Sequence, residues 1–482
     1  MSRGIRIRFS GLLMFAGNLV TLATGLVFNI LIARNLEPAT LGVWFFIGSV
    51  IPYFQILEKT IPYWAGRDIP RGVEVGRTTV LFNLLLSLPI TLIFIILSNV
   101  LAATIDTEPQ IILLSALLLP VYYAVAALTA VTYSTEPHKL ALRTIIIDGV
   151  KIPLAVVLLP FGLAGVIAAV LIGNVAYAVY LYGVSRKHLT DRFSFEWLKK
   201  AARRIWLPLH ENFIAYLSTA TDSVIVGVFL SSEELSRYGI GVAIASVVGT
   251  SKALTGAIYP KLLQKGRASV QELSALFKFQ HIFVTPLVAG GVVLAVQLVE
   301  IFGTRYLGAA PLLPYLLLAP ALSLLGLTMR SIITGLETVD KSHDNAELVK
   351  STLFTTQLPN YLYLGTLVVA TVLTVNQFGI IGAAAARLAA SITSLVPMVY
   401  FYRKNAPVST VLHGLEKTIP AAVAMMVVLY LVNPRGTVFT LGSIVLGGLV
   451  YFSVLLAVDR DSRDLTKRAV EEARKIILPS GD

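Results

Sequence analysis

The sequence predicts an all-α polytopic membrane protein with about fourteen transmembrane helices, and its composition carries this prediction. Of the 482 residues, 56% are hydrophobic and only 14% are charged, whereas soluble domains carry about 25% charged residues. Long uncharged apolar runs recur along the chain, each near the ~20 residues that a helix needs to cross a bilayer. A membrane β-barrel would show alternating segments of about 10 residues instead.

The apolar runs place the expected helices, with ends defined to within about three residues. They are 9–33, 41–64, 79–104, 110–134, 141–160, 163–184, 207–230, 238–260, 279–302, 311–336, 351–374, 378–402, 418–433 and 437–458. The first run follows Arg3, Arg6 and Arg8 and is too long for the core of a signal peptide. We therefore expect it to be retained as a membrane helix.

The positions of Lys and Arg predict how these helices are oriented. With the N-terminus in the cytoplasm, the outside loops carry only Arg34, Arg237, Arg305 and Arg435 of the 39 Lys and Arg residues. Cytoplasmic loops of membrane proteins are enriched in Lys and Arg. We therefore expect a multi-pass protein of the cell membrane with both termini in the cytoplasm. Its net charge of +12 then reflects orientation and contact with anionic membrane lipids, not nucleic acid.

Several classes of function are excluded by what the sequence lacks. Cysteine is absent, which excludes a disulfide framework, a thiol nucleophile and a Cys-ligated metal. The six His are scattered without metal-ligand spacing, and no GxxxxGK[ST] motif is present. The outside loops are too short for a catalytic domain. We expect a protein that is not an enzyme and that has neither a cofactor nor a metal site.

An internal repeat predicts the domain organisation. FGLAGVIAAVLIGNVAYAVYLYGVSRK (161–187) aligns without gaps to FGIIGAAAARLAASITSLVPMVYFYRK (378–404), and residues 23–42 align to 220–239. Each repeat holds six helices, an even number, so the two repeats enter the membrane from the same side.

The repeat therefore predicts two parallel six-helix lobes around a central cleft, with rocking of the lobes giving alternating access. The first lobe is 1–206, which includes a cytoplasmic linker, and the second is 207–404. Residues 405–482 add two C-terminal helices and a cytoplasmic tail.

Five segments in order along the chain carry a family resemblance. They are LIARNLEPATLGVW (31–44), DSVIVGVFLSSEELSRYGIGVAIASVV (222–248), AIYPKLLQKG (257–266), LVEIFGTRYLGAAPLLPYLLLAP (298–320) and FGIIGAAAARLAAS (378–391). Together they resemble the polysaccharide-transport, or oligosaccharide flippase, branch of the MATE/MOP exporter superfamily. The resemblance implies a flippase that moves a lipid-linked oligosaccharide, a polyprenyl phosphate or diphosphate glycolipid, across the cytoplasmic membrane. It also implies that glycan-assembly proteins are partners.

Other functions stay open at this point. One is a cation-coupled small-molecule antiporter of the same fold, and another is a lipid II-type flippase. The latter usually has basic residues in the first helix, and none lies between Phe9 and Ala33. A membrane glycosyltransferase or ligase would need a large outside loop. A lipid-binding scaffold without transport is a further alternative.

Cations inside the predicted helices are the candidate contacts of a substrate phosphate, because charges in the membrane are costly and default to functional hypotheses. Lys252 has no acid within a helical turn and lies on a face of small and polar residues. By the repeat it corresponds to Gln55, one turn from Lys59, so the two lysines are expected on opposing lobes. Arg387 is a third candidate, since a guanidinium fork suits phosphate oxygens.

Acidic residues inside the helices have two interpretations. Asp222 corresponds to Gly25 in the first repeat, and it is expected either to partner a cation on a neighbouring helix or to couple transport to Na⁺ or H⁺. Glu58 is a second candidate for coupling or gating. Asp148 and Lys151 are three residues apart on one helical face. They are expected to form either a structural pair or part of the cavity lining.

Overall fold

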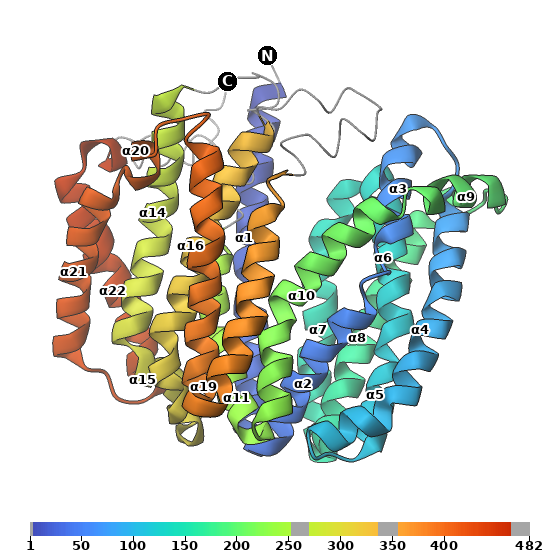
Figure 1. Cartoon of the computed structure of the whole chain (residues 1–482), viewed down its shortest axis with the longest axis horizontal. Helices are drawn as coiled ribbons and strands as arrows, with labels where there is room; N and C mark the ends of the chain where they lie inside the picture. The colour runs from blue at the N-terminus through green and yellow to red at the C-terminus, as the bar shows by residue number, and fades with distance from the viewer. Residues whose placement is uncertain (1–2, 252–268, 336–354, 464–482) are drawn as a thin grey trace, which may run out of the picture. The chain divides into compact units, whose positions relative to one another are not determined.

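The computed structural model describes residues 3–251, 269–335 and 355–463, and every regular element in these ranges is a helix (Figure 1). The all-α membrane fold predicted from the composition is confirmed. Nine stretches of the described residues form helices that are long and apolar enough to cross a membrane. Two shorter apolar helical stretches are Val20–Asn35, which is part of a longer first helix, and Pro38–Phe54. Each of the fourteen predicted ranges contains a helix. Residues 252–260 of the eighth range, 336 of the tenth and 351–354 of the eleventh lie outside the described residues.

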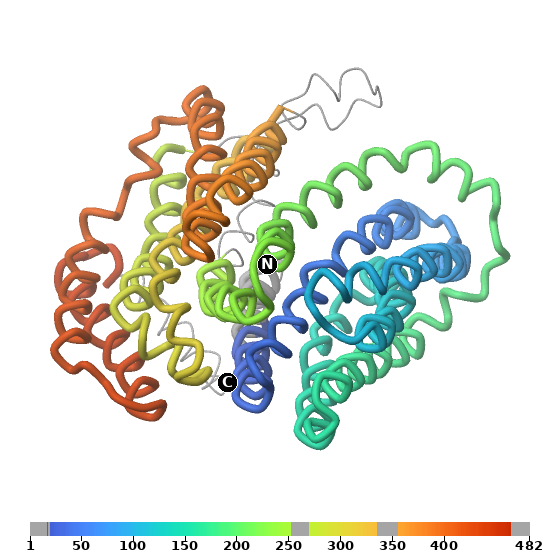
Figure 2. Tube along the Cα trace, turned by 60° about the horizontal axis from the view of Figure 1, so that its bottom comes forward, coloured from blue at the N-terminus to red at the C-terminus, as the bar shows by residue number. Residues whose placement is uncertain are grey.

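One compact unit comprises Met1–Ala243 and Leu358–Ser394. Its helices are α1 (Arg3–Asn35), α2 (Pro38–Phe54), α3 (Thr60–Asp68), α4 (Gly76–Thr104), α5 (Pro109–Ala116), α6 (Leu118–Thr135), α7 (Arg143–Leu158), α8 (Gly162–Ser185), α9 (Phe195–Arg203), α10 (Trp206–Phe229), most of α11 (Ser232–Gly249) and the larger part of α19 (Leu358–Tyr402). Helices α4, α6, α8 and α7 pack side by side in that order (Figure 2).

Small residues let α8 approach α7 closely. Gly165, Ala169 and Gly173 are buried at four-residue spacing, and a Cβ added to Gly173 would lie 2.9 Å from the carbonyl oxygen of Ile147 on α7. Small residues at such spacing allow the backbones of membrane helices to come together without a large hydrophobic contribution. This face therefore explains why the repeat sequence is rich in Gly and Ala.

Two glycines give the internal repeat a common backbone geometry. Gly162 has φ 61° and ψ −139°, and Gly379, its counterpart in the second repeat, has φ 56° and ψ −141°. Gly162 starts α8, and Gly379 interrupts α19, which divides that element into the two helices expected from the sequence. A side chain strongly disfavours this conformation. The shared Phe-Gly motif therefore encodes the same tight connection twice.

Replacing Gly162 by Ala is expected to destabilise the protein by about 1–3 kcal/mol, because the backbone would be held in a region that side chains avoid. Thermal unfolding in detergent micelles measures the effect. Gly183→Ala is the matched control, since Gly183 lies inside α8 with open space around its Cα. There the change is expected to be neutral or stabilising by up to about 1 kcal/mol. Equal behaviour of the two variants would contradict this account of the repeat.

The second unit comprises Ile244–Gln357 and Leu395–Asp482. Its described helices are α14 (Val270–Val293), α15 (Ala295–Glu300), α16 (Leu313–Gly335), α20 (Ser409–Leu412), α21 (Leu415–Val432) and α22 (Thr437–Val458), together with the ends of α11 and α19. The predicted boundaries at residues 206 and 404 differ from these limits, and the division into two six-helix lobes stays a prediction. An apolar core joins α14 to α21 and α22 through buried residues such as Ile282, Met425 and Tyr451.

A buried ion pair joins the end of α22 to α14. The Lys278 ammonium lies 2.7 Å from one carboxylate oxygen of Asp459 and 3.0 Å from the exposed Asp461. Asp459 also accepts hydrogen bonds from the backbone and the hydroxyl of Ser462. Burial raises the pKa of Asp459, but the hydrogen bonds from Lys278 and Ser462 outweigh it and hold the pKa below the ordinary value of 3.8.

Acid is therefore expected to weaken the attachment of α22 to α14. Because the folded-state pKa of Asp459 is lowered, the ionised carboxylate stabilises the folded protein. This contribution to stability is complete above the ordinary pKa of 3.8 and is lost as the pH falls through the folded-state pKa. Thermal unfolding between about pH 6 and about pH 3 should show a shallower acid dependence for Asp459→Asn than for the wild type. Asp461→Asn should change little, because that side chain is 77% exposed. Parallel curves for Asp459→Asn and the wild type would contradict this assignment.

Candidate functional site

A buried ion pair between Asp222 and Arg387 lies in the first unit. The Arg387 Nε lies 2.8 Å from one carboxylate oxygen of Asp222, and the Tyr238 hydroxyl donates to the same oxygen at 2.5 Å. The backbone N–H of Ser223 donates to the other oxygen at 2.8 Å. The side chain of Asp222 is completely buried and that of Arg387 is 13% exposed. The carboxylate is thus held by three donors.

This geometry supplies the cation that one interpretation of Asp222 requires. A buried charge is tolerated when it is paired and hydrogen-bonded, and the pair meets both conditions. The partner comes from α19, a distant part of the sequence, which contributes its first thirty-seven or so residues to this unit. The pairing tests neither the binding of a phosphate by Arg387 nor the binding of a coupling ion by Asp222. Both roles stay proposals.

Glu58 and Lys59 lie where the predicted second helix is interrupted. Helix α2 ends at Phe54 and α3 begins at Thr60, and the residues between form turns. Neighbouring residues on a continuous helix point about 100° apart, and on that ground they would not pair. Because the helix is broken here, the Lys59 ammonium instead lies 3.5 Å from a carboxylate oxygen of Glu58.

The two side chains of this pair differ sharply in exposure. That of Glu58 is 6% exposed, whereas that of Lys59 is 56% exposed. The Tyr216 hydroxyl donates to Glu58 at 2.6 Å and the Gln55 amide donates to it at 3.0 Å. The Lys59 ammonium also lies 5.1 Å from the centre of the Tyr216 ring. Lys59 is therefore positioned by two groups and still accessible.

Side chains from three other helices satisfy carbonyl groups at this break. Asn83 of α4 donates to the Glu58 carbonyl at 2.9 Å, Tyr123 of α6 donates to the Phe54 carbonyl at 2.8 Å, and Asn212 of α10 donates to the Ile56 carbonyl at 3.3 Å. A non-helical backbone at membrane depth is tolerated only where protein or water satisfies it. Interrupted helices are also where transporters commonly build binding sites.

Asp148 and Lys151 form a third pair in the same unit. Their charged groups lie 2.5 Å apart, and both side chains are largely buried, at 10% and 14% exposure. Thr24 of α1 donates to Asp148 at 2.5 Å, and the Lys151 ammonium lies 4.5 Å from the centre of the Phe28 ring. These contacts attach α7 to α1 and favour the structural interpretation of the pair over cavity lining.

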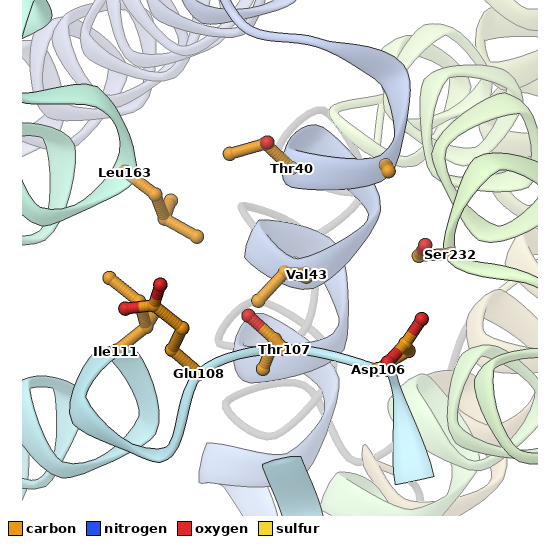
Figure 3. Close-up of a pocket in the computed structure, with 9 residues that line it drawn as sticks. Thr40, Val43, Asp106, Thr107, Glu108, Ile111, Leu163 and Ser232 are labelled. Atoms are coloured by element: carbon orange, nitrogen blue, oxygen red, sulfur yellow. The ribbon is translucent and has the colours of Figure 1, made fainter. Parts of the chain in front are cut away.

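A cavity of about 300 Å³, lined by both polar and apolar side chains, opens in the first unit (Figure 3). Asp106, Thr107 and Glu108, from the loop between α4 and α5, line one side, and Thr40 and Val43 of α2 line another. Ser232, at the start of α11, Ile111 of α5 and Leu163 of α8 also line it. The predicted topology puts these loops outside the cell. The candidate residues discussed above are not among those that line it.

The candidate residues predicted from the sequence thus form three separate pairs. Lys252 lies outside the described residues. Within the ranges that the structure describes, no group of three or more His, Cys, Asp or Glu could hold a metal ion. Sequence reasoning missed Tyr216, Tyr238 and Asn83, which bind the pairs and the break. The sequence signal that could have found these residues is a polar group inside an apolar helix. For tyrosine this signal is ambiguous, because most of the side chain is an apolar ring.

Comparison with known proteins agrees with this architecture. The chain matches the model of a polysaccharide biosynthesis protein family over residues 73–311, just under half of its length. No curated protein matches it by sequence.

Three solved structures are similar. A lipid II flippase, MurJ, in an inward closed conformation has a TM-score of 0.75 at 14% identity, covering 93% of this chain and 99% of MurJ. A multidrug resistance MATE family transporter of the MOP superfamily, in an inward-facing conformation, has a TM-score of 0.56 at 15% identity. The match covers 80% of this chain and 95% of the transporter. A mutant of the Vibrio cholerae MATE transporter VcmN has a TM-score of 0.55 at 16% identity. The match covers 83% of this chain and 95% of VcmN.

At these identities the structural likeness shows the fold alone. Taken with the family match, it confirms the predicted resemblance to the polysaccharide-transport branch of the MATE/MOP exporter superfamily. The chain is a multi-pass membrane protein with the fold of these transporters.

Proposed function

We propose that the protein is a flippase that moves a lipid-linked oligosaccharide across the cytoplasmic membrane by alternating access. The family match to polysaccharide biosynthesis supports the class of cargo, and the likeness to a lipid II flippase and to MATE transporters supports transport rather than an enzymatic reaction. The substrate would carry a polyprenyl phosphate or diphosphate, whose head crosses the membrane while its tail stays in lipid.

The observation that carries this proposal is the exposed ammonium of Lys59 beside a broken helix. A lysine at membrane depth is stable only if it faces water, a headgroup or a counter-ion. Lys59 keeps more than half of its side chain exposed while Glu58 and the Tyr216 ring hold its position. The exposed ammonium is thus open to an arriving phosphate. We propose Lys59 and Lys252 as the phosphate contacts.

Arg387 takes a different part in this proposal. Its guanidinium is paired with Asp222 and only 13% exposed, so binding a phosphate would require the pair to open. We propose that Arg387 serves as the built-in counter-ion of Asp222, and that the pair holds α10 and α19 together during transport.

The membrane potential is the proposed source of energy. Moving one negative charge outward, away from the negative interior of the cell, releases ~2.3 kcal/mol per 100 mV. The sequence contains no GxxxxGK[ST] motif for binding nucleotide phosphates. The proposed orientation, with both termini in the cytoplasm of a cell-membrane protein, puts Lys59 nearer the inner leaflet, from which the head would enter.

Two related functions have an observation in their favour. The likeness to MurJ favours lipid II as cargo, and the buried acids Asp222 and Glu58 favour a cation-coupled antiporter.

Ligand-dependent thermal stabilisation of the purified protein separates the three functions, since a ligand at about 100 times its Kd adds about 2.7 kcal/mol. A diphosphate-linked oligosaccharide lipid should stabilise most, lipid II less and a cationic dye not at all. Stabilisation by the dye alone would overturn the flippase proposal.

A further inference from the structure

We propose that the broken second helix carries a proton-binding site at Glu58, and that binding of the substrate phosphate at Lys59 is linked to protonation of Glu58. This rests on the proposed function, because it needs an anionic head at Lys59. The linked groups are contiguous in the chain and lie in one compact unit. The ligand assigned to Glu58 is therefore a proton, taken up when the headgroup binds.

The first step is that Glu58 and a phosphate would share a single ammonium. Among the described residues, Lys59 is the one cation that forms an ion pair with Glu58. If the ammonium turns toward a phosphate, the carboxylate keeps the hydrogen bonds from Tyr216 and Gln55 but loses its counter-ion. A buried carboxylate without a counter-ion is costly, and the cost disappears when it binds a proton.

The second step is the charge of the arriving headgroup. A phosphate or diphosphate beside Glu58 adds a like charge, and a nearby like charge favours the neutral form of a carboxyl group. The loss of Lys59 and the arrival of the anion therefore act in the same direction. Linkage is reciprocal, so a proton on Glu58 must strengthen headgroup binding by the same factor as the headgroup strengthens proton binding.

The third step is the set of other groups that face Glu58. Tyr122 and Tyr123 of α6 and Tyr216 of α10 interact with its charge, and Asn83 of α4 binds its backbone carbonyl. Among the described residues named here, these neighbours are phenols and an amide, so Glu58 is the one carboxyl group of the cluster. The charge that the Lys59 ammonium and the headgroup both act on is therefore that of Glu58.

The local geometry also suits a proton that must be exchanged. Glu58 lies in a turn rather than inside a regular helix, and its neighbour Lys59 is exposed. The side chain of Asn83 is fully buried, and its Oδ1 atom has no hydrogen-bond partner. An unpaired acceptor beside the break is a group to which a protonated carboxyl or a water molecule could donate.

Headgroup binding to the full-length protein in lipid nanodiscs tests this linkage. The probe is a short-chain polyprenyl diphosphate sugar. Such a diester lacks the second ionisation of a phosphate monoester, at about pH 6, and so keeps its charge between about pH 5.5 and about pH 8. Wild-type affinity is expected to fall with rising pH, by up to about tenfold per pH unit. Glu58→Gln should bind with nearly constant affinity across this range. Glu196→Gln, an exposed acid on α9, should keep the wild-type dependence.

Tyr216→Phe provides a second, independent variant if Glu58→Gln does not fold. The Tyr216 hydroxyl donates to the carboxylate, so its removal favours the protonated form. The midpoint of the pH dependence should then move to higher pH, which a merely structural role would not cause. Constant affinity of the wild type would overturn the proton site alone. Absence of binding at every pH would instead overturn the proposed function.

Discussion

Arg387→Leu is expected to lower the free energy of unfolding by about 3–5 kcal/mol, the usual cost of leaving one member of a buried ion pair without its partner. Asp222 is completely buried, so water cannot replace the guanidinium. Chemical unfolding in detergent micelles, followed by tryptophan fluorescence, measures the change. Lys200→Met is the control, because the Lys200–Glu196 pair is exposed and such pairs contribute at most about 1 kcal/mol.

The double variant distinguishes an ion pair from two independent packing contacts. Arg387→Leu combined with Asp222→Asn removes both charges, so it should be clearly more stable than Arg387→Leu alone. If the effects of the two single changes simply add, the pair is not the source of the stability. Transport by Asp222→Asn at several pH values and Na⁺ concentrations then addresses the coupling alternative. An unchanged rate and an unchanged ion dependence would exclude Asp222 as a coupling site.

Lys59→Met is expected to have the largest effect on transport. Truncating one member of a charge pair with a bound phosphate costs about 2 kcal/mol or more, which corresponds to a roughly 30-fold loss in apparent affinity. The variant is also expected to lose some stability at neutral pH, because the buried Glu58 carboxylate is left without its counter-ion. Translocation at subsaturating glycolipid measures the loss, and Lys200→Met should behave like the wild type. Normal translocation by a folded Lys59→Met protein would remove Lys59 from the site.

The sequence predicted the helices well because the bilayer imposes strong constraints on composition. Each of the fourteen apolar runs contains a helix among the described residues, and the two Phe-Gly motifs marked connections that share one backbone geometry. The break at residues 55–59 was missed. Pro52 precedes it, but the segment is otherwise apolar enough to read as one helix. What stabilises the break is the set of amide and hydroxyl groups on α4, α6 and α10, and a single sequence does not show that these helices meet.

The sequence identified the charged residues inside the helices more successfully than it identified which of them pair. Asp148 and Lys151 could be paired from their spacing, because three residues separate neighbours on one helical face. Asp222 and Arg387 are 165 residues apart, and their contact depends on tertiary packing. A free cation and a paired cation look the same in a sequence. That is why Arg387 was expected to bind phosphate, although the structure gives it a carboxylate partner.

The most direct test of flippase activity is translocation of a fluorescent diphosphate-linked oligosaccharide lipid in sealed proteoliposomes. The fraction of the lipid that reaches the opposite leaflet is followed by a glycan-cleaving enzyme added outside. Rapid loss of protection is expected with the wild-type protein, faster under a potential that drives the anion outward, and much slower with Lys59→Met. Full protection with correctly inserted wild-type protein, at every potential, would contradict the proposal that this chain flips lipid-linked glycans.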